Sequence, residues 1–246
     1  MSTFLILAYL FFIGSLLGWG LEVLFRKFFS SSNPEHRWIN PGFCIGPYVP
    51  LYGSGLCILY LLATLGDQTG IEDSVSGRAL LFFGMPASMT VIEYIAGILL
   101  LKIAKVRLWD YSMLWGNIDG LICPLFSFFW SIMGAIYYFA IHSYILRALQ
   151  WLANNLAFSF VIGFFFGVFT IDVAYSVHLV SRLKRFAEEN GVIVKYENLK
   201  AHIHGARERA KLRQRFFFPL HTVRPLQEHL QEAREALEKI RERRSS

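Results

Sequence analysis

Three acidic residues stand inside long apolar stretches of this sequence, and they are its clearest candidates for chemistry. Glu22, Glu93 and Asp172 are each the one Asp, Glu, Lys or Arg of an apolar run of more than 20 residues. A charge at the centre of a bilayer costs about 2.5–3.5 kcal/mol on insertion scales, so such residues are functional candidates by default. A carboxyl group there can bind or relay a proton or a cation, or act as a general acid or base.

The elements that must position these acids are membrane-spanning helices. Five stretches approach or exceed the roughly 20 residues that a span requires: residues 4–25, 43–65, 79–101, 121–141 and 156–180. Soluble core helices rarely run so far without a polar face, which disfavours a soluble protein. We therefore expect an all-α, polytopic membrane protein with five transmembrane helices.

Positive charge alternates along the connections between these stretches. The connections after the first and third stretches each carry three Lys or Arg, whereas those after the second and fourth carry one each. Cytoplasmic loops carry the excess of Lys and Arg. The pattern predicts an outside N-terminus, a cytoplasmic C-terminus and a multi-pass location in the plasma membrane.

The chain divides by charge into residues 1–180 and residues 181–246. The second part carries sixteen Lys and Arg against nine Asp and Glu, with apolar residues at helical spacing near its end. This pattern predicts a basic, amphipathic, helical cytoplasmic tail that contacts membrane lipids, a partner or the membrane body. Nucleic acid is not an expected partner, because acidic residues interrupt the positive charge.

A segment rich in Gly and Pro covers residues 40–55, with three prolines and four glycines. Such a segment cannot begin a regular helix, and irregular backbone at membrane depth needs partners from protein or water. We expect a broken or re-entrant start to the second span, with a kinked helix as the alternative. Two GxxxG spacings, Gly14/Gly18 and Gly163/Gly167, permit close helix packing.

Depth along the helices places all three acids toward the cytoplasm. Glu93 and Asp172 each lie eight residues before the inner end of a span, or ~12 Å at ~1.5 Å per residue, and Glu22 lies ~5 Å deep. This convergence predicts a cytosol-facing acidic pocket for a substrate or ion, formed by Glu22, Arg26, Asn40, Tyr48, Tyr52, Glu93, Tyr94, Trp109, Asp110, Asn117 and Asp172.

The alternative for each group is structural. Glu22 and Arg26 have the i, i+4 spacing of an intrahelical pair, and Glu93 can be neutral or hydrogen-bonded between helices. The loop that contains Asp110 and Asn117 has turn and cap chemistry. The sequence lacks GxxxxGK[ST], HExxH and GxSxG motifs, so we expect no metal or cofactor and no P-loop ATPase within this chain.

The combined pattern resembles a bacterial family labelled putative ABC-transporter type IV, or CmpB-like, over roughly residues 5–180. The matching residues are Gly18, Trp19 and Glu22; Asn40, Gly42, Phe43, Gly46, Pro47, Tyr48, Pro50, Tyr52 and Gly53; Glu93, Tyr94 and Gly97; Trp109, Asp110, Tyr111 and Ser112; and Asn117, Gly120, Cys123, Phe126, Ser127 and Trp130. The resemblance implies a permease component, and an ABC permease of this kind needs a separate ATPase as its partner.

Three functions remain open from the sequence. A transporter or transport-associated subunit, alone or as a homo-oligomer, would use Glu22 and Glu93 to bind or relay protons or cations. A membrane enzyme acting on a lipid or lipid-linked substrate would use the same acids for proton transfer. A regulatory scaffold would depend on the tail instead of on Glu93.

Overall fold

The computed structural model describes residues 2–30, 33, 36–190, 193–195 and 199, and nearly all of its regular structure is helical. The long helices are α1 (Thr3–Phe28), α2 (Pro50–Thr69), α3 (Val75–Ala104), α4 (Pro124–Ile136), α5 (His142–Asn154) and α6 (Ser159–Asn190). Short helical turns are η1 (Ile71–Asp73), η2 (Tyr137–Ile141) and η3 (Leu156–Phe158). The strands β1 (Val106–Arg107) and β2 (Val194–Lys195) form a parallel pair. The prediction of an all-α protein is confirmed apart from this pair.

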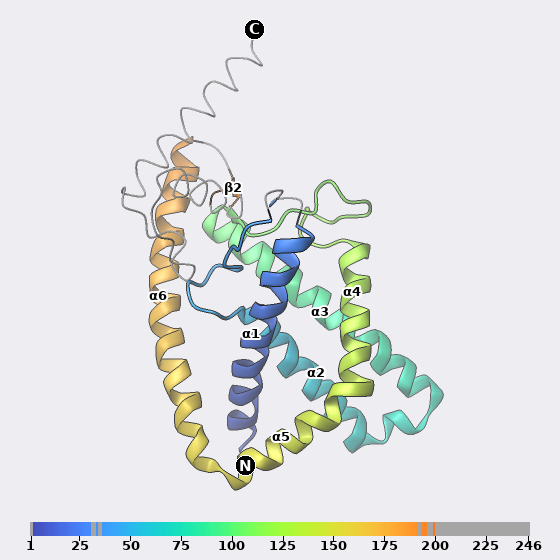
Figure 1. Ribbon diagram of the computed structural model, residues 1–246. Coiled ribbons are helices and arrows are strands. Elements are labelled where there is room, and N and C mark those ends of the chain that lie inside the picture. Colours follow the sequence, from blue (N-terminus) through green and yellow to red (C-terminus); the bar gives the residue numbers. More distant parts are fainter. Residues whose placement is uncertain (1, 31–32, 34–35, 191–192, 196–198, 200–246) are drawn as a thin grey trace.

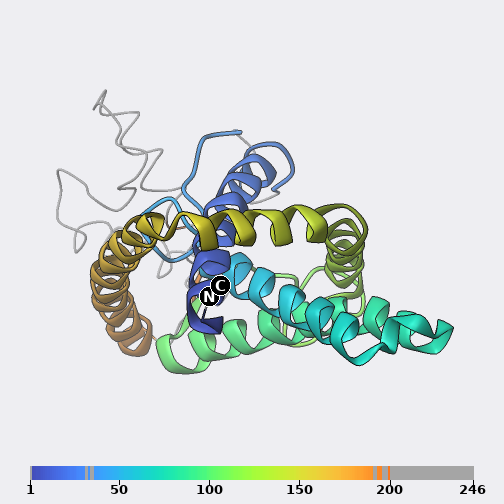
Figure 2. The same cartoon turned by 90° about the horizontal axis from the view of Figure 1, so that it is seen from below.

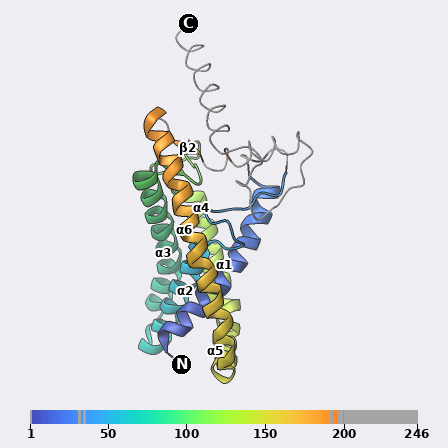
Figure 3. The ribbon, with the colours of Figure 1, turned by 90° about the vertical axis from the view of Figure 1, so that its left-hand side faces the viewer.

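The helices α1, α3 and α6 run toward one end of the molecule, and α2, α4 and α5 run toward the other (Figures 1 and 3). The start of α1, the turn between α2 and α3, and the α5–η3–α6 region lie at one end, which we call the N-terminal end. The last turns of α1 and α3 and the loop before α4 lie at the other end, which we call the loop end. Seen along the bundle, α5 crosses from α4 to α6 (Figure 2).

Among the residues that the structure describes, four helices are long and apolar enough to cross a membrane: Thr3–Phe28, Val75–Lys102, Pro124–Asn154 and Leu156–Arg185. The chain is thus built as a multi-pass membrane protein. The predicted second span, residues 43–65, is helical only from Pro50 onward, and α2 is not among these four helices. The predicted fourth span, residues 121–141, begins at Pro124 and continues through the π-helical turn η2 into α5.

Irregular backbone precedes α2, as the Gly/Pro segment predicts. Residues 41–49 form no helix, and the segment returns to the middle of the bundle before α2 begins (Figure 1). Gly42 has a φ of 71°, a conformation that favours glycine. The amide of Val49 donates to the carbonyl of Ser15 on α1 at 3.0 Å. Pro50 then occupies the first turn of α2, where its missing N–H is not needed.

Small residues bring α1 and α2 into direct contact. A Cβ atom at Gly18 would lie 2.2 Å from Cβ of Tyr52, and one at Gly14 would lie 2.9 Å from Cβ of Leu56. The predicted close packing at Gly14 and Gly18 is therefore confirmed. Gly163 and Gly167 have open space beside them within the described part of the chain.

The predicted boundary at residue 181 falls inside α6, which continues to Asn190. The predicted amphipathic helix near the end of the tail lies outside the described residues.

Candidate functional site

Six side chains from five parts of the chain form a connected group near the loop end, which we call the acid cluster. They are Glu22 and Arg26 of α1, Tyr52 of α2, Glu93 of α3, Tyr111 of the loop before α4, and Trp130 of α4.

Glu93 is the most deeply buried acid of the cluster, with 3% of its surface exposed. Its Oε2 accepts a hydrogen bond from Nε1 of Trp130 at 2.9 Å, and its Oε1 accepts one from the hydroxyl of Tyr111 at 3.0 Å. Both donors are neutral. A carboxylate in this position gains hydrogen bonds but no counter-charge from these two partners, so binding a proton or a cation would relieve its desolvation.

Glu22 lies in a more charged environment. Nε of Arg26 donates to its Oε1 at 3.0 Å, and the hydroxyl of Tyr52 donates to its Oε2 at 2.8 Å. The Tyr52 ring in turn packs on Trp130, with ring centroids 5.5 Å apart. The two glutamates are thereby connected through Tyr52 and Trp130, and the absence of a Cβ at Gly18 is what lets Tyr52 approach α1.

Tyr111 closes the cluster from the loop. Its ring stacks on Phe126 with centroids 4.3 Å apart, and its backbone amide donates to the carbonyl of Gly120 at 2.8 Å. Burial raises the pKa of Tyr111 well above its ordinary value, and the neighbouring charge of Glu93 raises it further. Tyr111 is therefore a neutral hydrogen-bond donor across the physiological pH range.

Asp172 belongs to a second group that holds the irregular segment. Its Oδ1 accepts the backbone amide of Ile45 at 3.1 Å, and its Oδ2 accepts the amide of Gly46 at 2.7 Å. The hydroxyls of Tyr48 and Ser176 also donate to this carboxylate. Asp172 thus supplies the acceptors that an irregular segment at membrane depth cannot obtain from its own backbone.

Asn40 secures the start of the same segment. Nε1 of Trp19 donates to its Oδ1, and its Nδ2 donates to the carbonyl of Ile45, both at 2.6 Å. Asn40 is 1% exposed, so these bonds are made away from solvent.

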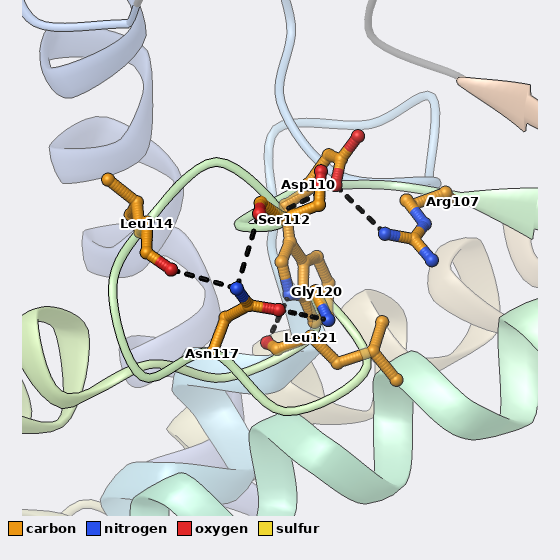
Figure 4. A network of polar contacts seen from close by, with 8 residues as sticks. Arg107, Asp110, Ser112, Leu114, Asn117, Gly120 and Leu121 are labelled. Carbon is orange, nitrogen blue, oxygen red and sulfur yellow. Dashed lines mark hydrogen bonds and ion pairs between the residues drawn. The ribbon is translucent and has the colours of Figure 1, made fainter.

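The loop between β1 and α4 is folded by its own polar side chains (Figure 4). Oδ1 of Asp110 accepts from the guanidinium of Arg107 at 2.8 Å and from the amide of Ser112 at 3.1 Å. Nδ2 of Asn117 donates to the carbonyls of Ser112 and Leu114, and its Oδ1 accepts the amide of Gly120.

Two further predicted residues hold this loop, one from within it and one from α3. Nε1 of Trp109 donates to the carbonyl of Leu121 at 2.8 Å, and the hydroxyl of Tyr94 on α3 donates to Asp119 at 2.9 Å. The loop network therefore positions Tyr111 next to Glu93.

The structure divides the eleven predicted pocket residues among three groups. Glu22, Arg26, Tyr52 and Glu93 meet in the acid cluster; Asn40, Tyr48 and Asp172 hold the irregular segment; and Tyr94, Trp109, Asp110 and Asn117 shape or anchor the loop. The pocket itself stays a prediction. Trp130 and Tyr111 are not among the predicted pocket residues. The sequence did carry a signal for Trp130, because an indole N–H in an apolar helix needs a buried hydrogen-bond acceptor.

Long apolar helices with carboxyl groups buried between them define a multi-pass membrane protein with an internal polar site. Residues 9–177 match the family described as "Putative ABC-transporter type IV", and the chain belongs to that family. Nothing among curated proteins or solved structures matches the chain.

Proposed function

We propose that this chain is the membrane-embedded subunit of a transport system and that the acid cluster binds or relays a proton or a cation on the cytoplasmic side. The observation that carries the proposal is Glu93: a 3% exposed carboxyl group in an apolar helix whose hydrogen bonds come from the neutral donors Trp130 and Tyr111. Intramembrane acids of this kind commonly mark an ion or proton path.

The other members of the cluster have supporting roles in this proposal. Arg26 forms an ion pair with Glu22, while Tyr52 and Trp130 connect Glu22 to Glu93. Tyr111 and the loop that carries it cover Glu93 from the loop end, which the charge pattern assigns to the cytoplasm. An energy source would be a separate ATPase, in agreement with the family's description.

Infrared difference spectroscopy of the full-length chain in lipid nanodiscs tests the site directly. The carboxyl bands of Glu93 are assigned by their loss in Glu93→Gln, and spectra are compared across pH and before and after adding Na⁺, K⁺ or Mg²⁺. We expect the Glu93 bands to change with pH or with one of these cations. The matched control is Asp73→Asn, which makes the same acid-to-amide change at an exposed residue of η1, outside the acid cluster and its loop. Glu93 bands that stay constant under all these conditions would reject the proposal.

Transport is tested in vesicles that contain the chain together with any ATPase that co-purifies from native membranes. Proton and cation movement should be lost in Glu93→Gln and retained in Asp73→Asn. Movement that is equal in the two variants would remove Glu93 from the mechanism.

A regulatory scaffold is the second candidate, and the internal bonding of the cluster favours it. Glu22 is paired with Arg26 and Glu93 already has two donors, as a structural polar network requires. For a scaffold, Glu93→Gln would leave cellular function intact, whereas deletion of residues 191–246 would abolish it.

A further inference from the structure

A second buried polar group lies at the N-terminal end, away from the acid cluster. His142 is the first residue of α5 and is 8% exposed. Its Nδ1 lies 3.0 Å from the hydroxyl of Tyr137, and its Nε2 lies 3.4 Å from Oδ2 of Asp67 at the end of α2. His142 thus contacts both the junction between α4 and α5 and the last turn of α2.

The backbone at this junction is unusual. Residues Tyr137–Ile141 form a π-helical turn in which the amide of His142 donates to the carbonyl of Tyr137. Turns of this kind are rare and frequently occur at functional sites. Here the turn places the His142 ring beside the Tyr137 ring, with centroids 5.6 Å apart.

The titratable groups that face His142 come from two elements. Asp67 and Tyr60 approach from α2, and Tyr137 approaches from η2; Cys57 of α2 adds an electrostatic interaction with Tyr137. The Asp67 side chain is 43% exposed, so the buried imidazole has a partner that reaches solvent. The Asp67 carboxylate can therefore stabilise a positive charge on the imidazole ring through Nε2.

We propose that His142, Asp67 and Tyr137 form a proton-binding site that fastens the end of α2 to the α4–α5 junction. In the neutral tautomer that satisfies both contacts, Nε2–H donates to Asp67 and Nδ1 accepts from the Tyr137 hydroxyl. A proton from solvent adds to Nδ1, Tyr137 rotates its hydroxyl to become the acceptor, and the contact with Asp67 becomes a charge-assisted pair. Charge-assisted bonds are shorter and stronger than neutral ones, so the proton tightens the link.

The site is independent of the proposed function of the acid cluster. It lies at the opposite end of the bundle, where the turn between α2 and α3 and the start of α1 are found (Figure 1). The charge pattern of the loops assigns this end to the outside. The site would therefore respond to the pH of the external compartment.

Proton binding is tested by NMR of the full-length chain in nanodiscs with isotope-labelled histidine rings. The His142 signal is assigned by its loss in His142→Gln, and it should shift as the pH is varied across the range in which histidine side chains change charge. Asp67→Asn should lower the proton affinity of His142 roughly threefold to tenfold, because a neutral amide no longer favours the imidazolium. Asp73→Asn removes an exposed carboxylate from the same end and should leave the titration unchanged.

The link between helices has its own readout. Amide hydrogen exchange of residues 64–70, corrected for intrinsic rates, should slow severalfold as the pH falls through the midpoint found by NMR. His142→Gln should remove this change. A His142 signal that does not titrate, or one that shifts equally in Asp67→Asn and Asp73→Asn, would overturn the proposal. Hydrogen exchange of α2 that depends on pH as strongly in His142→Gln as in the wild type would also overturn it.

Discussion

Glu93 and Asp172 are both carboxyl groups in apolar helices, but their partners differ in kind. Asp172 accepts two backbone amides of the irregular segment together with the hydroxyls of Tyr48 and Ser176. Glu93 accepts from two side chains, those of Trp130 and Tyr111, on regions whose backbone is already bonded.

The difference separates a group that the fold needs from one that it could do without. The amides of Ile45 and Gly46 cannot be replaced, so removing Asp172 leaves backbone donors without acceptors at membrane depth. Trp130, Tyr111 and Glu93 could all be apolar without harming any backbone bond, and replacing a buried polar set by apolar groups is often neutral. This contrast is what leads us to propose a functional role for Glu93.

The largest expected effect on stability is that of Asp172→Ala. Loss of the acceptor for Ile45, Gly46 and Tyr48 should lower the free energy of unfolding by about 3–5 kcal/mol, since each unsatisfied buried donor costs about 1–3 kcal/mol. Denaturant unfolding in mild detergent measures this. Ser176→Ala, which removes only the Ser176 hydroxyl from the same carboxylate, should cost about 1 kcal/mol. Equal losses in the two variants would show that the amides find other partners.

Gly18→Ala should have the next largest effect and should lower the free energy of unfolding by about 1–3 kcal/mol, which is typical of overpacking. The new Cβ would lie 2.2 Å from Cβ of Tyr52, so α1 and α2 must separate and the bond from Tyr52 to Glu22 must lengthen. Gly20→Ala on the same helix meets nothing within 4 Å and should leave stability unchanged or slightly raised. If Gly18→Ala and Gly20→Ala have the same free energy of unfolding, α1 and α2 do not need close contact. The acid cluster would then tolerate a wider separation of the two helices.

Glu93→Gln should change stability by about 1 kcal/mol or less. The amide oxygen can still accept from Trp130, and the amide nitrogen can donate to the oxygen of Tyr111. The same unfolding measurement checks this value. A loss as large as that of Asp172→Ala would end the contrast between the two acids and would make Glu93 a structural residue.

The sequence predicted the helices better than it predicted the grouping of polar residues. Apolar runs and loop charges are local signals, and so is the Gly/Pro content that predicts an irregular start to α2. Estimated depth predicted that Glu22, Glu93 and Asp172 converge, and Glu22 and Glu93 do meet in the acid cluster. Depth alone could not separate Asp172 from Glu93, because the partners of Asp172 lie more than 120 residues earlier in the chain.

The group at the N-terminal end was missed for a related reason. Asp67 and His142 are 75 residues apart, and each looks like an ordinary polar residue near the end of an apolar stretch. The π-helical turn that places Tyr137 beside His142 has no sequence signature among the local patterns. Only the packing of α2 against the α4–α5 junction brings the three side chains together.

Tyr111→Phe should have a similarly small effect at neutral pH, about 0.5–1.5 kcal/mol for one lost hydrogen bond, because the stacking on Phe126 is kept. Its pH dependence is more informative. The pKa of Tyr111 is raised in the folded chain, so the unfolded chain releases this proton first as the pH rises above about 10. The wild type should then lose stability that Tyr111→Phe does not lose, and the difference between them should shrink as the pH rises. Unfolding of both variants between neutral and alkaline pH measures this difference. A constant difference would mean that Tyr111 reaches solvent, and Glu93 would then lack the cover from the loop that distinguishes it from Asp172.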